Sequence, residues 1–187
     1  MINKYTLSRF QNVRYVREHL DDLIENALFL SRYGEEDPER KIAEDNFSNA
    51  FEFILNEKDV ENDYRCLLQL HQILMKDLNS GIKSELNEQQ IAELSQMINQ
   101  PAKANLEIAI DVMLYILDKR LFADGDVRAA IMFSNKIMVD NGCGIITVSP
   151  SSVDTFRKKL KEYKDDEEND FKDWIYKYCI KGPKLDQ

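Results

Sequence analysis

A short polar turn at residues 120–128 carries the side chains best suited to chemistry in this chain of 187 residues. Asp124, Gly125 and Asp126 lie at its centre, and Arg128 follows two residues later. A glycine turn that leads into a helix presents unpaired backbone N–H groups and the positive end of the helix dipole to an anion. An arginine in the first helical turn can hold a phosphate with two donors, and a carboxylate beside it can hold Mg²⁺. These residues therefore indicate a nucleotide or phosphate site.

Two apolar segments must position this turn. Residues 106–117 and 129–139 both carry apolar side chains at helical spacing, so we expect one helix on each side of the turn. The same residues also fit an ordinary capped turn. In that case Asp124 or Asp126 would cap the second helix, and Arg128 would form a surface ion pair.

The turn resembles the signature of the Fic/Doc family, whose pattern is His-Pro-Phe-x-(Asp/Glu)-Gly-Asn-(Gly/Lys)-Arg between two helices. Phe122, Asp124, Gly125 and Arg128 stand at the family's phenylalanine, metal-binding acid, glycine and phosphate-binding arginine. The similarity continues through the helix and the Asn-Gly pair that follow, and it is closest to Doc-type bacterial members. The resemblance implies a cytoplasmic bacterial protein with a helical bundle fold, which would bind ATP or another nucleotide together with Mg²⁺ on Asp124.

Four positions depart from the family pattern. Arg120 replaces the histidine, Leu121 the proline, Asp126 the asparagine and Val127 the second glycine or lysine. The family's histidine takes the proton from the target hydroxyl, whereas an arginine stays protonated under ordinary conditions. Asp126 adds a carboxylate that repels phosphate unless a metal intervenes, and Val127 adds bulk where the backbone must approach closely. No intact catalytic residue therefore remains, and transfer chemistry is expected to be weak or absent.

The leading hypothesis is a degenerate Fic-family protein whose loop binds a nucleotide or phosphate through Phe122, Gly125, Asp126, Val127 and Arg128. A first alternative is a non-catalytic protein-interaction scaffold. A second is an active adenylyltransferase or phosphotransferase of Fic/Doc type with a different base, such as Asp126 or Asp118. The partner would be a protein target or an antitoxin-like protein.

Arg120 has two interpretations, because it could lie on the surface or point into the site and pair with an anion or with Asp126. Ser48 and Glu52 resemble the Ser-x-x-x-Glu pattern of a helix that blocks nucleotide binding in many Fic proteins. However, Ile131 stands where such proteins have the second arginine that this glutamate engages. A regulatory role is one hypothesis for this pair, and a polar position on a core helix is the other.

Composition narrows the class of protein. The net charge of −9 and the pI near 4.8 disfavour nucleic acids and anionic membranes as partners. No segment approaches eighteen apolar residues, and no signal peptide is recognisable. Cys66, Cys143 and Cys179 lack metal-binding spacing, which favours a reducing cytoplasm.

His71 lies among apolar residues and is expected to pack in the core, whereas His19 is expected to be exposed.

Periodicity predicts an all-α fold with a short strand or extended link at residues 143–148. The predicted domains are an N-terminal helical extension (1–36), a Fic-like helical domain (37–182) and a frayed tail (183–187). The first segment should be one helix over 7–33. Later helices are predicted at 38–55, 60–78, 88–99, 106–117, 129–139, 155–164 and 171–180. The acidic run at 165–170 should be a turn, and residues 81–83 fall at the family's target-binding flap.

Overall fold

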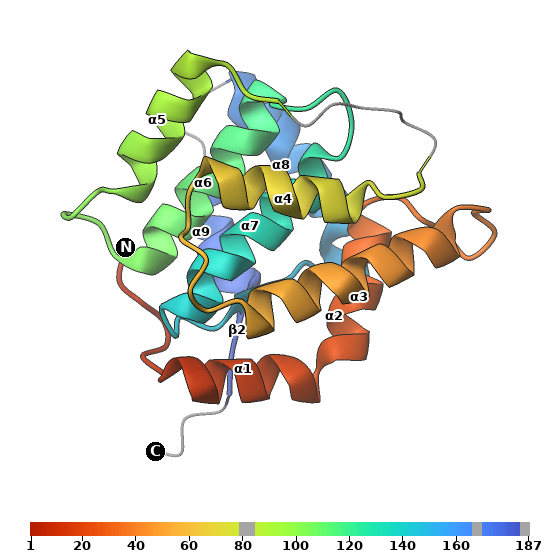
Figure 1. Cartoon of the computed structure of the whole chain (residues 1–187), viewed down its shortest axis with the longest axis horizontal. Coiled ribbons are helices and arrows are strands. Elements are labelled where there is room, and N and C mark those ends of the chain that lie inside the picture. Colours follow the sequence, from red (N-terminus) through yellow and green to blue (C-terminus); the bar gives the residue numbers. More distant parts are fainter. Residues whose placement is uncertain (79–84, 166–169, 184–187) are drawn as a thin grey trace.

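The computed structural model describes residues 1–78, 85–165 and 170–183 (Figure 1). The flap prediction at residues 81–83, most of the acidic turn and most of the tail therefore lie outside the described residues. In chain order the elements are α1 (Arg9–Glu18), α2 (Leu20–Leu30), α3 (Arg40–Asn56), α4 (Tyr64–Leu74), α5 (Glu88–Ile98), α6 (Asn105–Lys119), α7 (Asp126–Asp140), β1 (Ile145–Ile146), the 3-10 helix η1 (Pro150–Ser152), α8 (Val153–Asp165), α9 (Phe171–Tyr178) and β2 (Ile180–Lys181). The all-α prediction is confirmed.

Helix α7 is the centre of the fold. All of its residues from Arg128 to Val139 are buried, and α1, α2, α3, α4 and α6 all contact it (Figure 1). A helix that is covered on every side needs partners for its polar groups as well as its apolar ones. Lys136 accordingly donates from Nζ to the carbonyl of Val60 at 3.1 Å and pairs with Asp140.

The predicted extended segment is present as β1. It pairs with β2 in an antiparallel ladder, with Ile145 opposite Lys181 and Ile146 opposite Ile180. The prediction of a helix over residues 171–180 was wrong at its end, because α9 stops at Tyr178 and the chain continues into β2. Strand pairing with β1 supplies backbone partners that a single sequence does not reveal.

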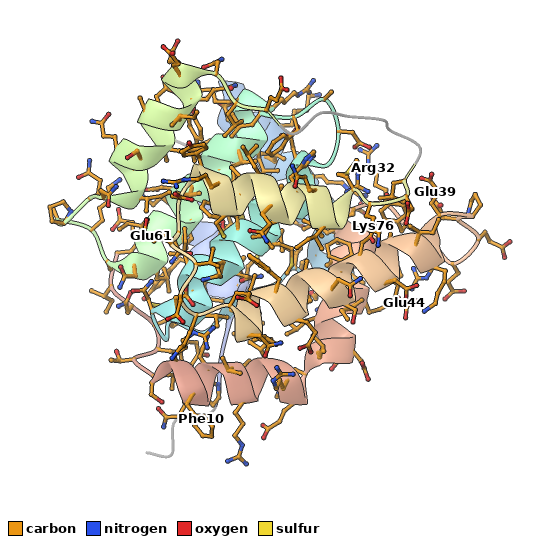
Figure 2. All side chains as sticks on the ribbon, viewed as in Figure 1. Phe10, Arg32, Glu39, Glu44, Glu61 and Lys76 are labelled. Carbon is orange, nitrogen blue, oxygen red and sulfur yellow. The ribbon has the colours of Figure 1, made fainter. Side chains whose placement is uncertain are left out.

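The N-terminal prediction of one helix was also wrong. Ser8 starts α1 with a capping box to Gln11, and α1 ends at His19, whose backbone (φ −122°, ψ 16°) leaves the helical region. Helix α2 then packs against α3 and α7, whereas Phe10 of α1 is 78% exposed and points away from the molecule (Figure 2). The domain boundary at residue 36 stays a prediction.

Other helix boundaries also differ from the prediction, and a side-chain cap accounts for the start of α4. The predicted helix over residues 60–78 is shorter at both ends, since the carboxylate of Asp63 accepts from the N–H groups of Arg65 (2.9 Å) and Cys66 (3.1 Å) and starts α4 there. Helix α3 begins at Arg40 rather than at Pro38. Helix α8 begins at Val153, directly after η1. By contrast, the predicted cap of α5 by Asn87 is confirmed, and it forms a capping box with Gln90.

The three cysteines are buried and free. Burial raises the pKa of the Cys66 and Cys179 thiols to about 12 and that of Cys143 to about 11, so these side chains stay protonated and pack as apolar groups. Across residues 1–78, 85–165 and 170–183, no helix has the length and apolar character needed to span a bilayer.

Candidate phosphate-binding site

The loop between α6 and α7 makes two left-handed turns. Arg120 ends α6 with φ 48°, and Gly125 starts α7 with φ 84°. A Cβ atom on Gly125 would lie 2.6 Å from Sδ of Met75 and 3.0 Å from Nε2 of His71. Because such a contact is too close for any Cβ and the backbone is left-handed, the position requires glycine.

His71 of α4 contacts this loop at two residues. Its Nε2 donates to the carbonyl of Asp124 at 2.8 Å, and its ring stacks on Phe122 with centroids 3.8 Å apart. Burial lowers the pKa of His71, which favours the neutral ring. The prediction of a packing histidine is confirmed. Its contact with the loop was missed, because no local pattern links α4 to residues 122–124.

Asp126 closes the loop with its own carboxylate. Its Oδ1 accepts from the N–H of Phe122 at 3.0 Å, and the backbone of Leu121 also donates to it. Burial raises the pKa of Asp126, although these donors and the charge of Arg120 act in the opposite direction. The Asp126 carboxylate therefore connects Phe122 to the first turn of α7.

Arg128 and Asp124 contact each other. The guanidinium of Arg128 is 5% exposed, and its Nη2 lies 3.1 Å from the Asp124 carboxylate. Its Nη1 donates to the hydroxyl of Tyr33, and its Cζ lies 5.4 Å from the centre of the Tyr33 ring. Asp124 also accepts from the N–H of Gly125 at 2.6 Å. The predicted phosphate and metal ligands thus form one ion pair, and Tyr33, which sequence reasoning missed, completes it.

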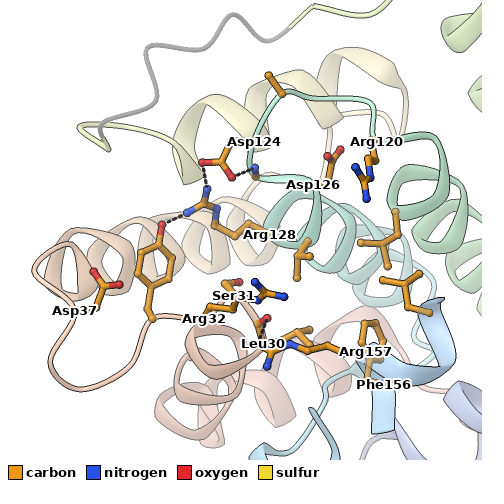
Figure 3. Close-up of a pocket in the computed structure, with 16 residues that line it drawn as sticks. Leu30, Ser31, Arg32, Asp37, Arg120, Asp124, Asp126, Arg128, Phe156 and Arg157 are labelled. Atoms are coloured by element: carbon orange, nitrogen blue, oxygen red, sulfur yellow. Dashed lines mark hydrogen bonds and ion pairs between the residues drawn. The ribbon is translucent and has the colours of Figure 1, made fainter. Parts of the chain in front are cut away.

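A cavity of about 580 Å³ opens beside this loop (Figure 3). Its charged lining consists of four arginines and three aspartates, Arg32, Arg120, Arg128, Arg157, Asp37, Asp124 and Asp126. Its apolar lining includes Leu30, Leu117, Phe156 and Leu160. The wall is therefore net positive, although the whole chain carries a net charge of −9.

The sequence-predicted residues are distributed unevenly over this cavity. Gly125, Val127 and Asp126 line it, and Arg120 lies at it next to Asp126 (Figure 3). The side chain of Arg120 is exposed and forms no ion pair within the described residues, so both interpretations of Arg120 stay predictions. Phe122 instead packs on His71 and is not part of the lining. Asp118, proposed as an alternative base, pairs with Lys119 at 3.2 Å and also lies outside the lining.

A metal at this site would have to compete with existing contacts. In the described part of the chain, no three His, Cys, Asp or Glu side chains are grouped so that they could hold a metal ion. Asp124 is engaged by Arg128 and by the N–H of Gly125. Mg²⁺ usually keeps several waters and takes oxygen ligands from bound phosphates, so Asp124 could contribute one ligand once a phosphate is present.

Ser48 and Glu52 lie on α3 away from the cavity lining. Glu52 pairs with Arg17 of α1 at 3.1 Å and accepts from Asn56 at 2.8 Å. The hydrogen bond from Arg17 lowers the pKa of Glu52. This arrangement fits the polar position on a core helix, and the regulatory role of Ser48 and Glu52 stays a prediction.

No family model matches the sequence, and no curated protein matches it significantly. Among solved structures, the fold matches residues 134–508 of Fic-1 from C. elegans with a TM-score of 0.64. The match covers 91% of this chain and 59% of that one, at 12% sequence identity. Identity this low shows the fold alone: the chain has a Fic-like helical fold.

Proposed function

We propose that this protein binds a nucleotide or another phosphate-bearing ligand in the cavity beside residues 120–128. The observation that carries the proposal is the net positive wall at the N-terminal end of α7 in a protein of net charge −9. Helix N-termini and arginine forks both favour bound phosphate. The cavity volume of about 580 Å³ is in the range of small-ligand sites.

In this proposal Arg128 is the phosphate ligand. Its guanidinium is positioned by Tyr33 and Asp124. A ligand phosphate would replace the Tyr33 hydroxyl or the Asp124 carboxylate as acceptor for its N–H groups. Asp124 would then be available to Mg²⁺. Arg120 adds a charge that makes no hydrogen bond or ion pair with the described residues and lies at the edge of the cavity (Figure 3).

Transfer of AMP or phosphate to a protein hydroxyl should be weak or absent. Arg120 stands where the family's histidine accepts the proton, and a guanidinium cannot accept one. An active transferase would need Asp126 as its base. That carboxylate lines the cavity, but it already accepts from the loop backbone.

A protein-interaction scaffold is the second candidate function. It is favoured by Asp126, because this carboxylate lines the cavity and a negative charge there repels a phosphate. The protein partner, whether a target or an antitoxin-like protein, and the bacterial cytoplasmic location follow from the family resemblance.

The test is a titration with ATP, ADP and AMP, with and without Mg²⁺, followed by thermal unfolding and by calorimetry. A ligand at a hundredfold excess over its dissociation constant stabilises the folded state by about 2.7 kcal/mol. Arg128→Ala should abolish the shift. Tyr33→Phe should strengthen binding severalfold, because it removes a competing acceptor from Arg128.

Tyr115→Phe is the matched control, since it also removes a tyrosine hydroxyl bond, here to Glu93 at 2.6 Å, outside the cavity. It should leave nucleotide binding unchanged. A wild-type protein that ignores millimolar nucleotide, or an Arg128→Ala protein that binds as well as wild type, would rule out the proposed site and leave the scaffold.

A further inference from the structure

The cavity has a second pair of arginines that the loop at residues 120–128 does not include. Arg32 follows the C-terminal end of α2, and Arg157 lies on α8. The backbone N–H of Arg32 donates to the carbonyl of Phe29 at 3.1 Å, and Nη2 of Arg157 reaches the same carbonyl at 3.3 Å. The two residues therefore meet at the end of α2, and Figure 3 shows both away from Arg120.

The charge of Arg32 has no partner within the described residues. Its side chain is exposed and makes no hydrogen bond or ion pair there, and its backbone is left-handed with φ 70°. The φ value turns the chain sharply between α2 and Tyr33, so the residue that follows Arg32 reaches Arg128. One turn of the chain thus connects the two arginine groups.

Arg157 is only loosely engaged. Its Nη2 donates to Phe29 and Leu30 over 3.3 and 3.4 Å, and its Nη1 lies 3.9 Å from the exposed carboxylate of Asp154. Contacts of this length are weak, and an exposed ion pair contributes little. Several donors of this guanidinium therefore remain for a ligand. Asp37 is the carboxylate of the lining that lies outside the glycine loop, and it accepts from the N–H of Glu39 at 2.8 Å.

A helix C-terminus attracts one cation, which satisfies its last carbonyls and complements its dipole. That role explains Arg157, whose donors reach Phe29 and Leu30. It does not explain a second arginine whose side chain makes no contact with these carbonyls. Arg32 is exposed and lines the cavity, so its guanidinium is available to an anion that enters there.

We propose that Arg32 and Arg157 form a second anion subsite, so that the ligand is a nucleoside with phosphate groups at two separate positions. This inference rests on the proposed function, because it assumes a first phosphate at Arg128. Four apolar side chains of the same cavity suit the nucleoside body that joins the two phosphates: Leu30, Leu117, Phe156 and Leu160.

Two constitutional isomers provide the test. Adenosine 3′,5′-bisphosphate carries its two phosphates apart, whereas ADP carries the same two phosphates in one chain. Calorimetry should find the bisphosphate bound roughly tenfold more tightly than ADP by wild type. Arg32→Ala and Arg157→Ala should each remove most of this preference and leave ADP affinity within about twofold.

Arg14→Ala is the matched control, because it removes an exposed helical arginine that pairs with Glu18, outside the cavity. It should preserve the preference. Equal binding of the two isomers by wild type, or a preference that survives in both Arg32→Ala and Arg157→Ala, overturns the second subsite but leaves the proposed function standing. If neither isomer binds, both proposals fail together.

Discussion

Asp126 and Arg128 are the residues that a phosphate would have to displace in the site that we propose at residues 120–128. Both side chains are engaged by the protein itself, Asp126 with the loop backbone and Arg128 with Tyr33 and Asp124. A ligand must therefore exchange these contacts for its own, and only the difference contributes to affinity.

Asp126→Asn should remove one contribution to stability that decreases as the pH rises. Burial raises the folded-state pKa of Asp126 above 3.8, so the folded protein holds this proton more tightly than the unfolded chain. The protonated carboxyl of Asp126 therefore contributes stability below pH 3.8. This contribution is lost as the pH rises through the folded-state pKa of Asp126. The asparagine does not titrate, and its amide oxygen can still accept from Phe122.

Urea unfolding from about pH 4 to about pH 7 measures this effect. The unfolding free energy of Asp126→Asn relative to wild type should increase with pH. A difference that stays constant, or that changes in the opposite direction, would show that the backbone donors and Arg120 outweigh burial at this carboxylate.

At the scale of elements, α4 acts as the support on which the glycine loop rests. Its His71 and the adjoining Met75 fill the space that a side chain at residue 125 would need. The loop geometry therefore depends on a helix far away in the sequence. Any substitution that adds volume at residue 125 should therefore displace Met75 or His71.

Gly125→Ala should destabilise the protein by roughly 2–4 kcal/mol, because it combines a left-handed alanine with overpacking against Met75 and His71. Gly34→Ala is the control, since a Cβ there meets nothing within 4 Å and should have almost no effect. Chemical unfolding compares the two variants. Equal stability of both would mean that α4 and the loop separate easily.

The sequence predicted the elements that bear a strong local signal. The helices that flank the glycine loop, the Asn87 cap and the extended segment near Ile145 are all present. The break at His19 and strand β2 were missed, because each depends on what the chain packs against. Apolar residues recur at helical spacing on both sides of His19, so the sequence pattern does not show that the chain changes direction there.

The candidate site was only partly predictable for the same reason. Gly125, Asp126 and Arg128 are neighbours in sequence, and the loop motif identifies them. Tyr33 reaches the cavity from the turn after α2 and Arg157 from α8, and neither carries a local signal for doing so. The predicted helix over residues 7–33 ends at Tyr33, but a predicted helix end does not reveal where that end lies in space.

At the scale of the whole molecule, two buried asparagines supply backbone partners to the segment around β1, and one of them, Asn12, reaches it from the N-terminal end of the chain. The amide of Asn12 on α1 donates to the carbonyl of Gly144 at 2.9 Å and accepts from its N–H at 3.0 Å. Asn135 on α7 makes the same pair of bonds with Ile146 at 2.9 and 2.7 Å. These amides replace the strand partners that a wider sheet would supply.

Asn12→Ala should cost roughly 2–4 kcal/mol, because it leaves both backbone groups of Gly144 buried without partners. Asn49→Ala, an exposed substitution on α3, should change stability little or raise it slightly through helix propensity. Thermal or urea unfolding measures both. If Asn12→Ala were as stable as Asn49→Ala, α1 would not be integral to the fold.

The buried cysteines have a practical consequence for following motion in this protein. Alkylating reagents require an exposed thiolate, and the raised pKa values and burial of all three thiols deny it to the folded chain. Cys66 lies on α4, Cys143 follows α7 and Cys179 follows α9. The labelling rate of each cysteine therefore measures how often a different region opens. The rate at Cys66 measures the opening of α4, the helix that contacts the glycine loop. The three native thiols can therefore report local opening without any introduced probe.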